Sequence, residues 1–179
     1  MHLLSKRFAY SSSINHNFWI AGCNLGKGLF AKRHINKGEE ILRFTGDIID
    51  FNQALAMERN QADALQIGNN LYINLEEPGR FVNHSCNPNA GIRNDVVLVA
   101  LQDIGKGEQV YYDYSATMDE DNWVMQCRCG SANCRKIVKD FKYLPSQVKQ
   151  KYLDLRVVQR FIAIQYQQSA AGKKKAMVC

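Results

Sequence analysis

The chain contains 179 residues, 46% of them hydrophobic, which fits one globular domain with a real core and excludes a largely disordered protein. It contains no apolar run long enough for a transmembrane helix, and no secretory signal follows its first basic residues. We therefore expect an intracellular protein without a membrane partner, in the cytoplasm or the nucleus. There, its six cysteines indicate metal ligands or free thiols rather than disulfide bonds.

The formal charge of +6 is unevenly distributed along the chain. Residues 1–134 hold 12 Lys and Arg against 15 Asp and Glu, a charge of −3, whereas residues 135–179 hold 11 against 2, a charge of +9. A segregated basic segment is typical of contact with nucleic acid or another acidic surface. The alternative is a solvated helix face followed by a loose basic tail.

Short β-rich segments dominate the first two thirds of the chain. Runs of β-branched and aromatic residues are separated by Gly or Asn, as is typical of strands joined by turns. The expected strands lie in FWIAG (18–22), GLFAKRHI (28–35), EEILRFTGDIID (39–50), NLYINL (70–75), NAGIR (89–93), VVLVALQD (96–103) and EQVYYDY (108–114). Asn94 and Asp95 predict a hairpin turn, and GKG at 105–107 predicts a second tight turn.

Two helices are expected among and after these strands. The first lies in NQALAMERNQADAL (52–65), with Asn52 as its N-cap. The second is one long amphipathic helix that begins at Pro145, packs on its own domain and ends near residue 168. Its apolar stripe comprises Val148, Tyr152, Leu155, Ile162 and Tyr166. The last residues, SAAGKKKAMVC (169–179), are expected to be disordered.

The strongest chemical signal is QCRCGSANCRK at residues 126–136. Cys127, Cys129 and Cys134 form the pattern C-x-C-x4-C. Two thiolates of an extended segment can reach one ion, and Gly130 lets the chain turn so that a third approaches it. The pattern therefore predicts three ligands of a zinc ion. Buried free thiols that only pack are the competing interpretation.

A closed structural zinc site needs a fourth ligand from elsewhere in the chain. Cys86 is the best candidate, with Cys23 and Cys179 as alternatives. Cys86 lies in RFVNHSCNPNAG (80–91), where an Asn and a His precede it. These residues alone leave three interpretations of the stretch open: a nucleophile with its base, a metal site, or a polar cluster that holds a ligand.

Two further stretches carry weaker signals. GCNLGKGLFA (22–31) resembles a phosphate-binding loop, but it is one residue short of G-x-x-x-x-G-K, and Gly28 stands where Ser or Thr would bind magnesium. A nucleotide triphosphate is therefore not expected, although Gly beside a strand lets the backbone approach a ligand closely. In GEQVYYDYS (107–115), strand alternation places Tyr112 and Tyr114 on one face, as an aromatic wall or as simple core packing.

Taken together, these stretches resemble the SET-domain family of protein lysine methyltransferases. The resemblance covers about residues 18–137 in the right order. It is carried by GKG (26–28), RFTGDII (43–49), YIN (72–74), RFVNHSCNPN (80–89), GEQVYYDY (107–114) and the zinc-binding post-SET element CRCGSANCRK (127–136). The chain departs from many histone-directed members because no cysteine-rich segment precedes residue 18. It looks like the compact, minimal SET proteins of bacteria and viruses.

The resemblance implies a mainly β fold of small sheets with some α-helix and a threaded, knot-like core. It implies S-adenosylmethionine as methyl donor, structural zinc, and a protein substrate with a target lysine, such as a histone or another basic DNA-associated protein. The expected cofactor-binding residues are Gly26, Lys27, Gly28, Asn83, His84 and Ile137. The expected catalytic residues are Tyr114 and Tyr112, the substrate-binding residues are Tyr72 and Tyr112, and the zinc ligands are Cys86, Cys127, Cys129 and Cys134.

These expectations divide the chain into five parts. They are an N-terminal segment (1–17), the SET domain (18–118), the post-SET zinc element (119–140), a C-terminal helix (141–168) and a basic disordered tail (169–179). Two other functions compete with an active enzyme: a catalytically inactive SET module that binds a partner, and a zinc-stabilised protein that binds nucleic acid or chromatin through its basic end.

Overall fold

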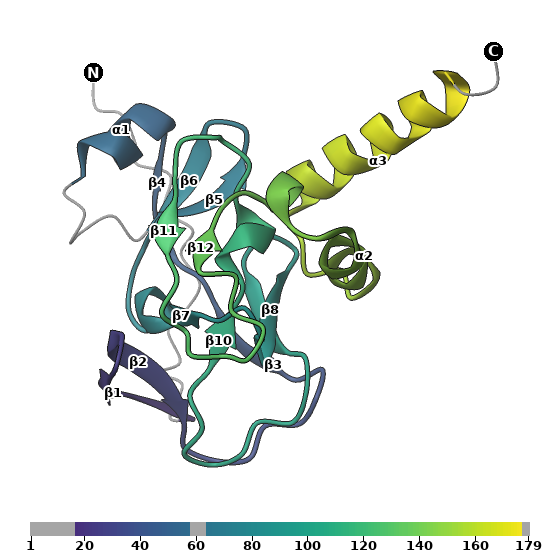
Figure 1. Cartoon of the computed structure of the whole chain (residues 1–179). Coiled ribbons are helices and arrows are strands. Elements are labelled where there is room, and N and C mark those ends of the chain that lie inside the picture. The colour runs from purple at the N-terminus through teal and green to yellow at the C-terminus, as the bar shows by residue number, and fades with distance from the viewer. Residues whose placement is uncertain (1–16, 58–63, 177–179) are drawn as a thin grey trace.

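The computed structural model describes residues 17–57 and 64–176 of the chain (Figure 1). The strands are β1 (Phe18–Cys23), β2 (Gly26–Ala31), β3 (Glu40–Arg43), β4 (Gly46–Ile49), β5 (Ala64–Gly68), β6 (Leu71–Leu75), β7 (Asn83–His84), β8 (Ala90–Arg93), β9 (Val97–Ala100), β10 (Tyr111–Tyr112), β11 (Met125–Gln126) and β12 (Ile137–Val138). The α-helices are α1 (Phe51–Ala56), α2 (Ser146–Asp154) and α3 (Arg160–Ala176), and the 3-10 helices are η1 (Gly79–Phe81), η2 (Tyr114–Thr117) and η3 (Phe141–Tyr143).

The strands form several small sheets, which confirms the mainly β fold predicted from the sequence. Strands β1 and β2 form an antiparallel hairpin, as do β11 and β12, and two three-stranded sheets have the orders β3-β9-β8 and β4-β6-β5. The remaining pair, β7 and β10, is parallel and aligns Asn83 with Tyr111 and His84 with Tyr112. This pairing brings the NHSC and YDY stretches side by side, although they are far apart in the sequence.

One hydrophobic cluster joins the sheets, and strand β9 belongs to two clusters at once. The central cluster includes Leu29 of β2, Ile73 of β6 and Leu98 of β9. Val97 and Val99, which alternate with Leu98, belong to a second cluster under the C-terminal helices. Because side chains alternate between the two faces of a strand, β9 is apolar on both faces. The uninterrupted apolar run VVLVA therefore predicts a central strand rather than an edge strand.

The predicted turn between β8 and β9 is confirmed, and it also anchors the C-terminal helix. Asn94 and Asp95 have φ angles of 49° and 67°, as both central residues of a tight hairpin turn require. The Asp95 carboxylate accepts a hydrogen bond from the Arg160 backbone N–H over 2.8 Å, which satisfies a free donor at the start of α3. The buried Gln159 side chain donates to the Gln66 carbonyl oxygen over 2.8 Å.

The first predicted helix is much shorter than its sequence pattern suggests. Helix α1 ends at Ala56, and Ala64 begins strand β5, so the prediction of a helix across residues 52–65 is wrong at its C-terminal end; residues 58–63 lie outside the described part. The predicted N-cap is also wrong. Asp50 caps the helix, because its carboxylate accepts from the Gln53 N–H and the Gln53 side chain accepts from the Asp50 N–H, the reciprocal arrangement of a capping box.

The second predicted helix is two helices rather than one. Helix α2 ends at Asp154, Arg156 takes a φ of 56°, and α3 begins at Arg160. Between them, Val157 and Val158 are buried in the core, and a Cβ on Gly91 would lie 2.8 Å from Val157. The apolar residues keep a helical spacing through this connection, but its close packing on β8 interrupts the helix. Tertiary packing here overrides the local preference for a helix.

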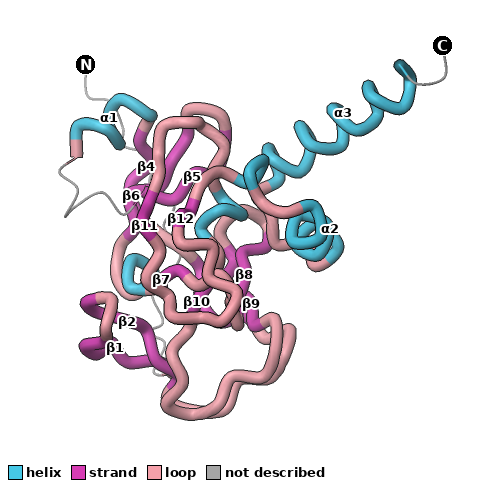
Figure 2. The backbone as a smooth tube through the Cα atoms, in the orientation of Figure 1, coloured by secondary structure: helices cyan, strands magenta, loops and turns pink. Residues whose placement is uncertain are grey.

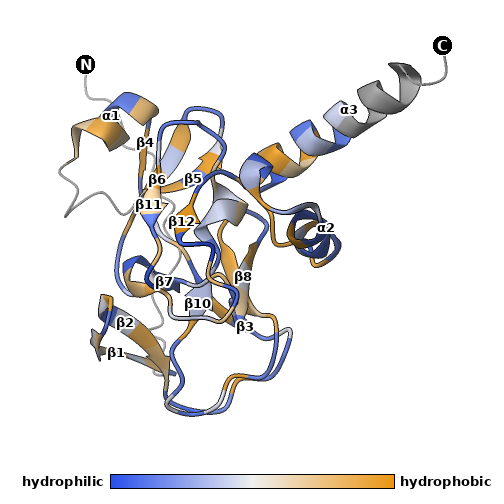
Figure 3. Cartoon of the chain, in the orientation of Figure 1, coloured by the Kyte–Doolittle hydropathy of each residue, from blue (hydrophilic) through white to orange (hydrophobic). Residues whose placement is uncertain are grey.

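The end of the chain also differs from the prediction. Helix α3 extends away from the sheets (Figures 1 and 2) and runs to Ala176. Residues 169–176 are therefore helical, where a disordered tail was expected. Helix α2 is mostly hydrophilic (Figure 3), and Tyr152 is its one buried residue. None of the described helices has the length and apolar character needed to cross a bilayer.

Candidate functional site

Four cysteines converge on one point, as the spacing and the resemblance together predict. The sulfur atoms of Cys86, Cys127, Cys129 and Cys134 all lie within 4.8 Å of one another, and those of Cys86 and Cys127 are 3.7 Å apart. Tetrahedral zinc with bonds of about 2.3 Å places its sulfurs about 3.8 Å apart, so the cluster has the size of a zinc site. Cys86 is the fourth member, whereas Cys23 lies beside Asn83 and Cys179 is outside the described residues.

The chain around the cluster is shaped by backbone turns. Gly130 has a φ of 71°, a conformation that a Cβ would strain, and the Cys134 N–H donates to the Ser131 carbonyl over 3.0 Å. Burial raises the pKa of the Cys86 thiol and of the Cys127 thiol. Without a cation these sulfurs would therefore stay protonated, and a divalent ion would supply the charge that makes them thiolates.

Asn83 and the GKG strand are in direct contact, as expected of residues that bind the same ligand. The Asn83 side-chain amide donates to the Lys27 carbonyl oxygen over 2.8 Å. A Cβ on Gly28 would lie 2.2 Å from Gln109 Nε2 and 3.3 Å from Asn83 Nδ2. Gly28 therefore leaves the space that the Gln109 and Asn83 side chains occupy. This close approach is the structural reason for a glycine at that position of β2.

His84 connects the strand pair to the cysteine cluster. Its ring is 3% exposed, and burial lowers its pKa to about 4 despite the nearby Asp113. The Tyr114 N–H donates to Nδ1 over 3.2 Å, which leaves the proton of the neutral ring on Nε2. Nε2 lies 3.4 Å from the Cys86 sulfur. A neutral His84 thus donates toward a metal ligand, the usual way in which a neighbouring group orients such a ligand.

The Tyr112 and Tyr114 rings lie against each other as an aromatic wall, although strand β10 ends at Tyr112 and Tyr114 begins the 3-10 helix η2. Their ring centroids are 4.7 Å apart, and Tyr112 also packs against Phe44 at 5.8 Å. Trp123, which the sequence did not single out, lies 6.3 Å from Tyr114. The Tyr114 hydroxyl donates to the Val82 carbonyl oxygen over 3.0 Å. Its oxygen therefore keeps lone pairs that can accept a hydrogen bond from a ligand.

Two predicted residues have other partners in the structure. Tyr72 is buried, its ring packs against Phe51, and its hydroxyl donates to the Glu120 carboxylate. Ile137 is 51% exposed on β12, opposite Gln126. Within residues 17–57 and 64–176, neither side chain makes a hydrogen bond or a ring contact with Asn83 or His84. Their assignment to a ligand remains a prediction.

A cleft beside the GKG strand has a volume of about 300 Å³. It is lined by Ile20, Ala21, Gly22, Lys27, Glu77 and Phe81. The Lys27 ammonium group lies 5.4 Å from the centroid of the Phe81 ring, and Glu77 adds a carboxylate to the same cleft. The cleft therefore offers one cation, one anion and an aromatic face next to the backbone that Asn83 contacts.

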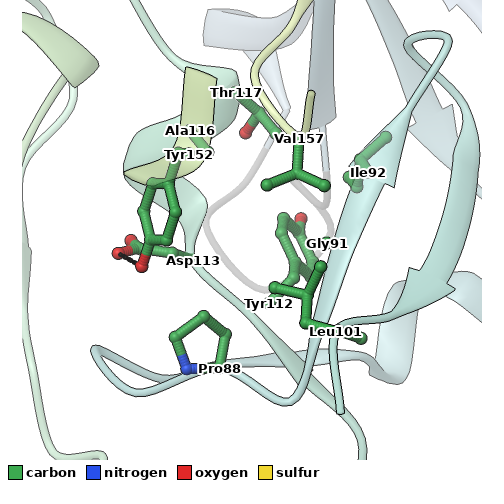
Figure 4. Close-up of a pocket in the computed structure, with 11 residues that line it drawn as sticks. Pro88, Gly91, Ile92, Leu101, Tyr112, Asp113, Ala116, Thr117, Tyr152 and Val157 are labelled. Carbon is green, nitrogen blue, oxygen red and sulfur yellow. Dashed lines mark hydrogen bonds between the residues drawn. The ribbon is translucent and has the colours of Figure 1, made fainter. Parts of the chain in front are cut away.

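A buried carboxylate, Asp113, escaped the sequence analysis although it stands between the two tyrosines. The Arg135 guanidinium donates to both of its oxygens over 2.8 and 2.7 Å, and the Tyr152 hydroxyl donates to it over 2.9 Å. Figure 4 shows Tyr152 directed at Asp113 from helix α2. The neighbouring gap has a volume of about 10 Å³, room for at most about one water. A charged residue inside an aromatic strand was the signal that could have found it.

Comparison with known proteins identifies the family of this chain. A family model described as the SET domain matches residues 26–115. The variant-silencing SET domain-containing protein of Plasmodium falciparum is 32% identical in an alignment of 130 residues, and the match covers 61% of this chain and 5% of that protein. Human histone-lysine N-methyltransferase 2D is 27% identical over 158 residues, covering 74% of this chain and 3% of that protein.

A third relative, histone-lysine N-methyltransferase trr of Drosophila melanogaster, is 28% identical over 160 residues. The match covers 74% of this chain and 6% of that protein. The chain thus spans only a few per cent of the length of these relatives. The segment that the family model matches, residues 26–115, carries the NHSC and YDY motifs.

Proposed function

Because the chain belongs to the SET-domain family, we propose that it is an S-adenosylmethionine-dependent protein-lysine N-methyltransferase. The observation that carries the proposal is the parallel pairing of β7 with β10. It joins Asn83 and His84 to the Tyr112 and Tyr114 wall and, through His84 and Cys86, to a cluster of four cysteines. Methyl transfer to a lysine would need a cofactor clamp beside an aromatic channel, and the cysteine cluster would hold the two together.

The cofactor would be held by the GKG strand together with Asn83 and His84. When bound, S-adenosylmethionine supplies a methyl group that its sulfonium already activates. Gly26 and Lys27 are exposed, whereas Gly28 is buried beneath the Gln109 and Asn83 side chains. The adjacent cleft places the Lys27 ammonium and the Glu77 carboxylate where an amino-acid group could pair with both. Ile137, exposed behind the cysteine cluster, would add an apolar contact.

The aromatic wall would receive the substrate lysine. A lysine side chain in water has a pKa of about 10.4, and an apolar aromatic channel lowers it because burial disfavours the charged form. The Tyr114 hydroxyl and the Val82 carbonyl, already hydrogen-bonded to each other, are positioned to accept hydrogen bonds from the amine and so to aim its lone pair. Tyr112 would limit the room around that amine, and Tyr72 would contact the substrate at the channel.

Zinc would be structural, held by the four cysteines. Three of them come from the post-SET element and one from the NHSC stretch, so the ion would bind the two segments together. The proposed substrate is a histone or another basic protein. Its support is the similarity to the human and Drosophila relatives, which are histone-lysine N-methyltransferases. The basic residues after position 134 would hold the enzyme near a nucleic-acid-bound substrate.

Labelled S-adenosylmethionine tests the proposal directly. The purified chain is incubated with the labelled cofactor, a panel of histones and a cell extract, and the labelled bands are identified by mass spectrometry. We expect label on lysine residues of a basic protein, and none with Tyr114→Phe. Label on no protein, from a chain that contains zinc and is folded, would contradict the proposal.

The basic segment favours one other function, a zinc-stabilised protein that binds nucleic acid or chromatin. An inactive SET module that only binds a partner is related to it. Calorimetry with S-adenosylmethionine distinguishes them, because only the enzyme needs a site for the cofactor. Binding that is lost in Asn83→Ala would support the enzyme, whereas a folded, zinc-loaded chain without any cofactor binding would favour these alternatives.

A further inference from the structure

Asp113 is a buried carboxylate whose partners come from three separate parts of the chain. Its side chain is 1% exposed. Arg135, which immediately follows Cys134, donates to both carboxylate oxygens, and the Ser115 N–H donates to one of them over 3.1 Å. Tyr152 of helix α2 donates to the other. A buried charge is tolerable only when its acceptor positions are satisfied in this way.

Arg135 connects Asp113 to the cysteine cluster through hydrogen bonds to both. Its backbone N–H donates to the Cys86 sulfur over 3.4 Å, and its guanidinium forms the paired hydrogen bonds to Asp113 and a further one to the Ser115 hydroxyl over 3.2 Å. The residue thus fixes the end of the post-SET element both to the strand that bears Tyr112 and to a metal ligand. A paired guanidinium–carboxylate contact defines orientation as well as distance.

Tyr152 is the contribution of helix α2 to this arrangement. It is 3% exposed and is the one buried residue of that helix. Burial and the neighbouring Asp113 raise the pKa of its phenol, so the hydroxyl remains a donor. The surrounding packing leaves a gap of only about 10 Å³ (Figure 4). Val148 and Leu153 of the same helix are partly buried against the second cluster, and the Tyr152 hydroxyl adds a hydrogen bond to a buried carboxylate.

We propose that Tyr152 is a positioning residue, which holds the Asp113 carboxylate so that Arg135 keeps the zinc-binding segment in place against the Tyr112 strand. Helix α2, beyond the SET and post-SET motifs, is then a working part of the site. The expected effect of this segment on methyl transfer rests on the proposed function. The expected effect of Tyr152 on the cysteine cluster does not. A purely packing role for the Tyr152 ring is the alternative.

Tyr152→Phe separates these roles, because it keeps the ring and removes only the hydroxyl. Tyr166→Phe is the matched control: Tyr166 lies on α3 and packs against Phe141. Zinc release from the full chain is followed with an excess of a coloured chelator, after melting curves show which variants are folded. A hydrogen bond to a charged group typically accounts for about a tenfold change or more in an equilibrium constant. We expect release about five- to tenfold faster from Tyr152→Phe and unchanged from Tyr166→Phe.

A double-mutant cycle shows whether Tyr152 acts through Asp113 and Arg135. Arg135→Lys keeps the charge but loses the paired geometry, so it should also speed zinc release. If both residues act on one carboxylate, the double variant should release zinc much less rapidly than the product of the two single effects predicts. Independent, multiplicative effects would overturn the proposal. The proposal would also be overturned if Tyr152→Phe released zinc at the wild-type rate. If Tyr152→Phe does not fold, a wild-type rate of zinc release from Arg135→Lys would overturn it instead.

Methyl transfer supplies a second measurement. A looser zinc segment should raise the KM for the cofactor more than it lowers kcat, because the segment flanks the cofactor clamp and leaves the Tyr114 hydroxyl in place. A fall in kcat alone would count against the positioning role. If the wild-type chain transfers no methyl group at all, the proposed function fails, while the zinc-release comparison still decides the role of Tyr152.

Discussion

Single buried polar side chains organise the candidate site. His84 is neutral because burial lowers its pKa to about 4, and so it can accept from the Tyr114 N–H on one ring nitrogen and donate toward Cys86 from the other. The buried Asp113 side chain is held in place by Arg135 and Tyr152, which both donate hydrogen bonds to its oxygens. Each side chain connects segments that are far apart in sequence. Removing one partner therefore leaves another buried group unsatisfied, which costs more than one contact.

At this scale, Cys86→Ser should remove the metal. The wild-type chain should contain about one zinc ion, and a serine oxygen is a poor substitute for a thiolate in a closed four-sulfur site. Cys23→Ser is the matched control, since Cys23 lies beside Asn83 and Gln109 and outside the cluster. Elemental analysis of the purified variants gives the result. Full zinc content in Cys86→Ser would mean that another residue supplies the fourth ligand.

The two tyrosines of the aromatic wall should have different roles. Tyr114→Phe removes the hydroxyl that is bonded to the Val82 carbonyl, and almost no product should form. Tyr112→Phe removes a hydroxyl that would hold the amine and occupy the room needed by a growing methylammonium. A methylated amine would have to displace that hydrogen bond, worth about 1 kcal/mol, before it could accept another methyl group.

We therefore expect mainly mono- and dimethyllysine from the wild-type chain and more trimethyllysine from Tyr112→Phe. Intact-mass time courses on one peptide measure the products. A wild-type chain that proceeds readily to trimethyllysine would show that Tyr112 does not limit the channel, and an active Tyr114→Phe would remove that residue from the chemistry.

At the scale of elements, periodicity predicted long strands better than it predicted helices. The central strand β9 and its hairpin with β8 follow from an apolar run and a turn at Asn94 and Asp95. Strands β7 and β10 have two residues each, too few for any pattern. The helix break before Arg160 was also hidden, because it arises from packing against Gly91 rather than from local preference.

Some residues of the candidate site could likewise be predicted from the sequence, whereas others could not. The cysteine spacing and the family motifs were enough to gather the four cysteines and to pair Asn83 with the GKG strand. Partners contributed by tertiary structure had no local signature. Tyr152 stood in the predicted apolar stripe as a packing residue, and only the folded chain shows its hydroxyl on Asp113. Glu120, which accepts from Tyr72, lies in the acidic run of residues 119–121, and nothing in that run predicts this contact.

The β1–β2 hairpin permits a test of the cofactor clamp that uses two glycines of one element. A Cβ at Gly28 would meet the ends of the Gln109 and Asn83 side chains, whereas a Cβ at Gly22 would meet no atom within 4 Å. Gly28→Ala should displace the Asn83 amide and weaken S-adenosylmethionine binding about tenfold or more, because a hydrogen bond left unmade costs about 1–3 kcal/mol.

Gly22→Ala should bind the cofactor like the wild type. Calorimetric titration measures the affinities, and melting temperatures show whether both variants remain folded. Equal affinities in the two variants would mean that the Gln109 and Asn83 side chains over Gly28 do not serve the ligand. A large loss in Gly22→Ala instead would move the binding site toward the other end of the hairpin.

At the scale of the whole molecule, charge and structure divide the chain at about the same place. The SET segment and the cysteine cluster lie in the part that carries a net charge of −3, and the residues after 134 carry +9. Helices α2 and α3 belong to this basic part, yet Tyr152, Val157 and Gln159 pack into the domain. The basic region is therefore anchored at its start and extends away from the sheets at its end (Figure 1).

Deleting residues 169–179 should therefore leave methyl transfer to a short peptide unchanged but weaken action on a DNA-bound substrate. The deletion removes the three lysines at 173–175 and keeps Tyr152 of α2 and Ile162 of α3, which are buried. Each lysine that neutralises a phosphate contributes about 0.9 to the slope of log affinity against log salt, so the slope should fall by at most about 3.

Replacing only those lysines by Gln is the matched control, and it should reproduce the deletion. Raising the salt should erase the difference. If full-length and shortened chains bind DNA-bound substrate alike at low salt, the basic end does not tether the enzyme. Tyr152 of α2, with its hydrogen bond to Asp113, would then be the part of the C-terminal region that serves the site.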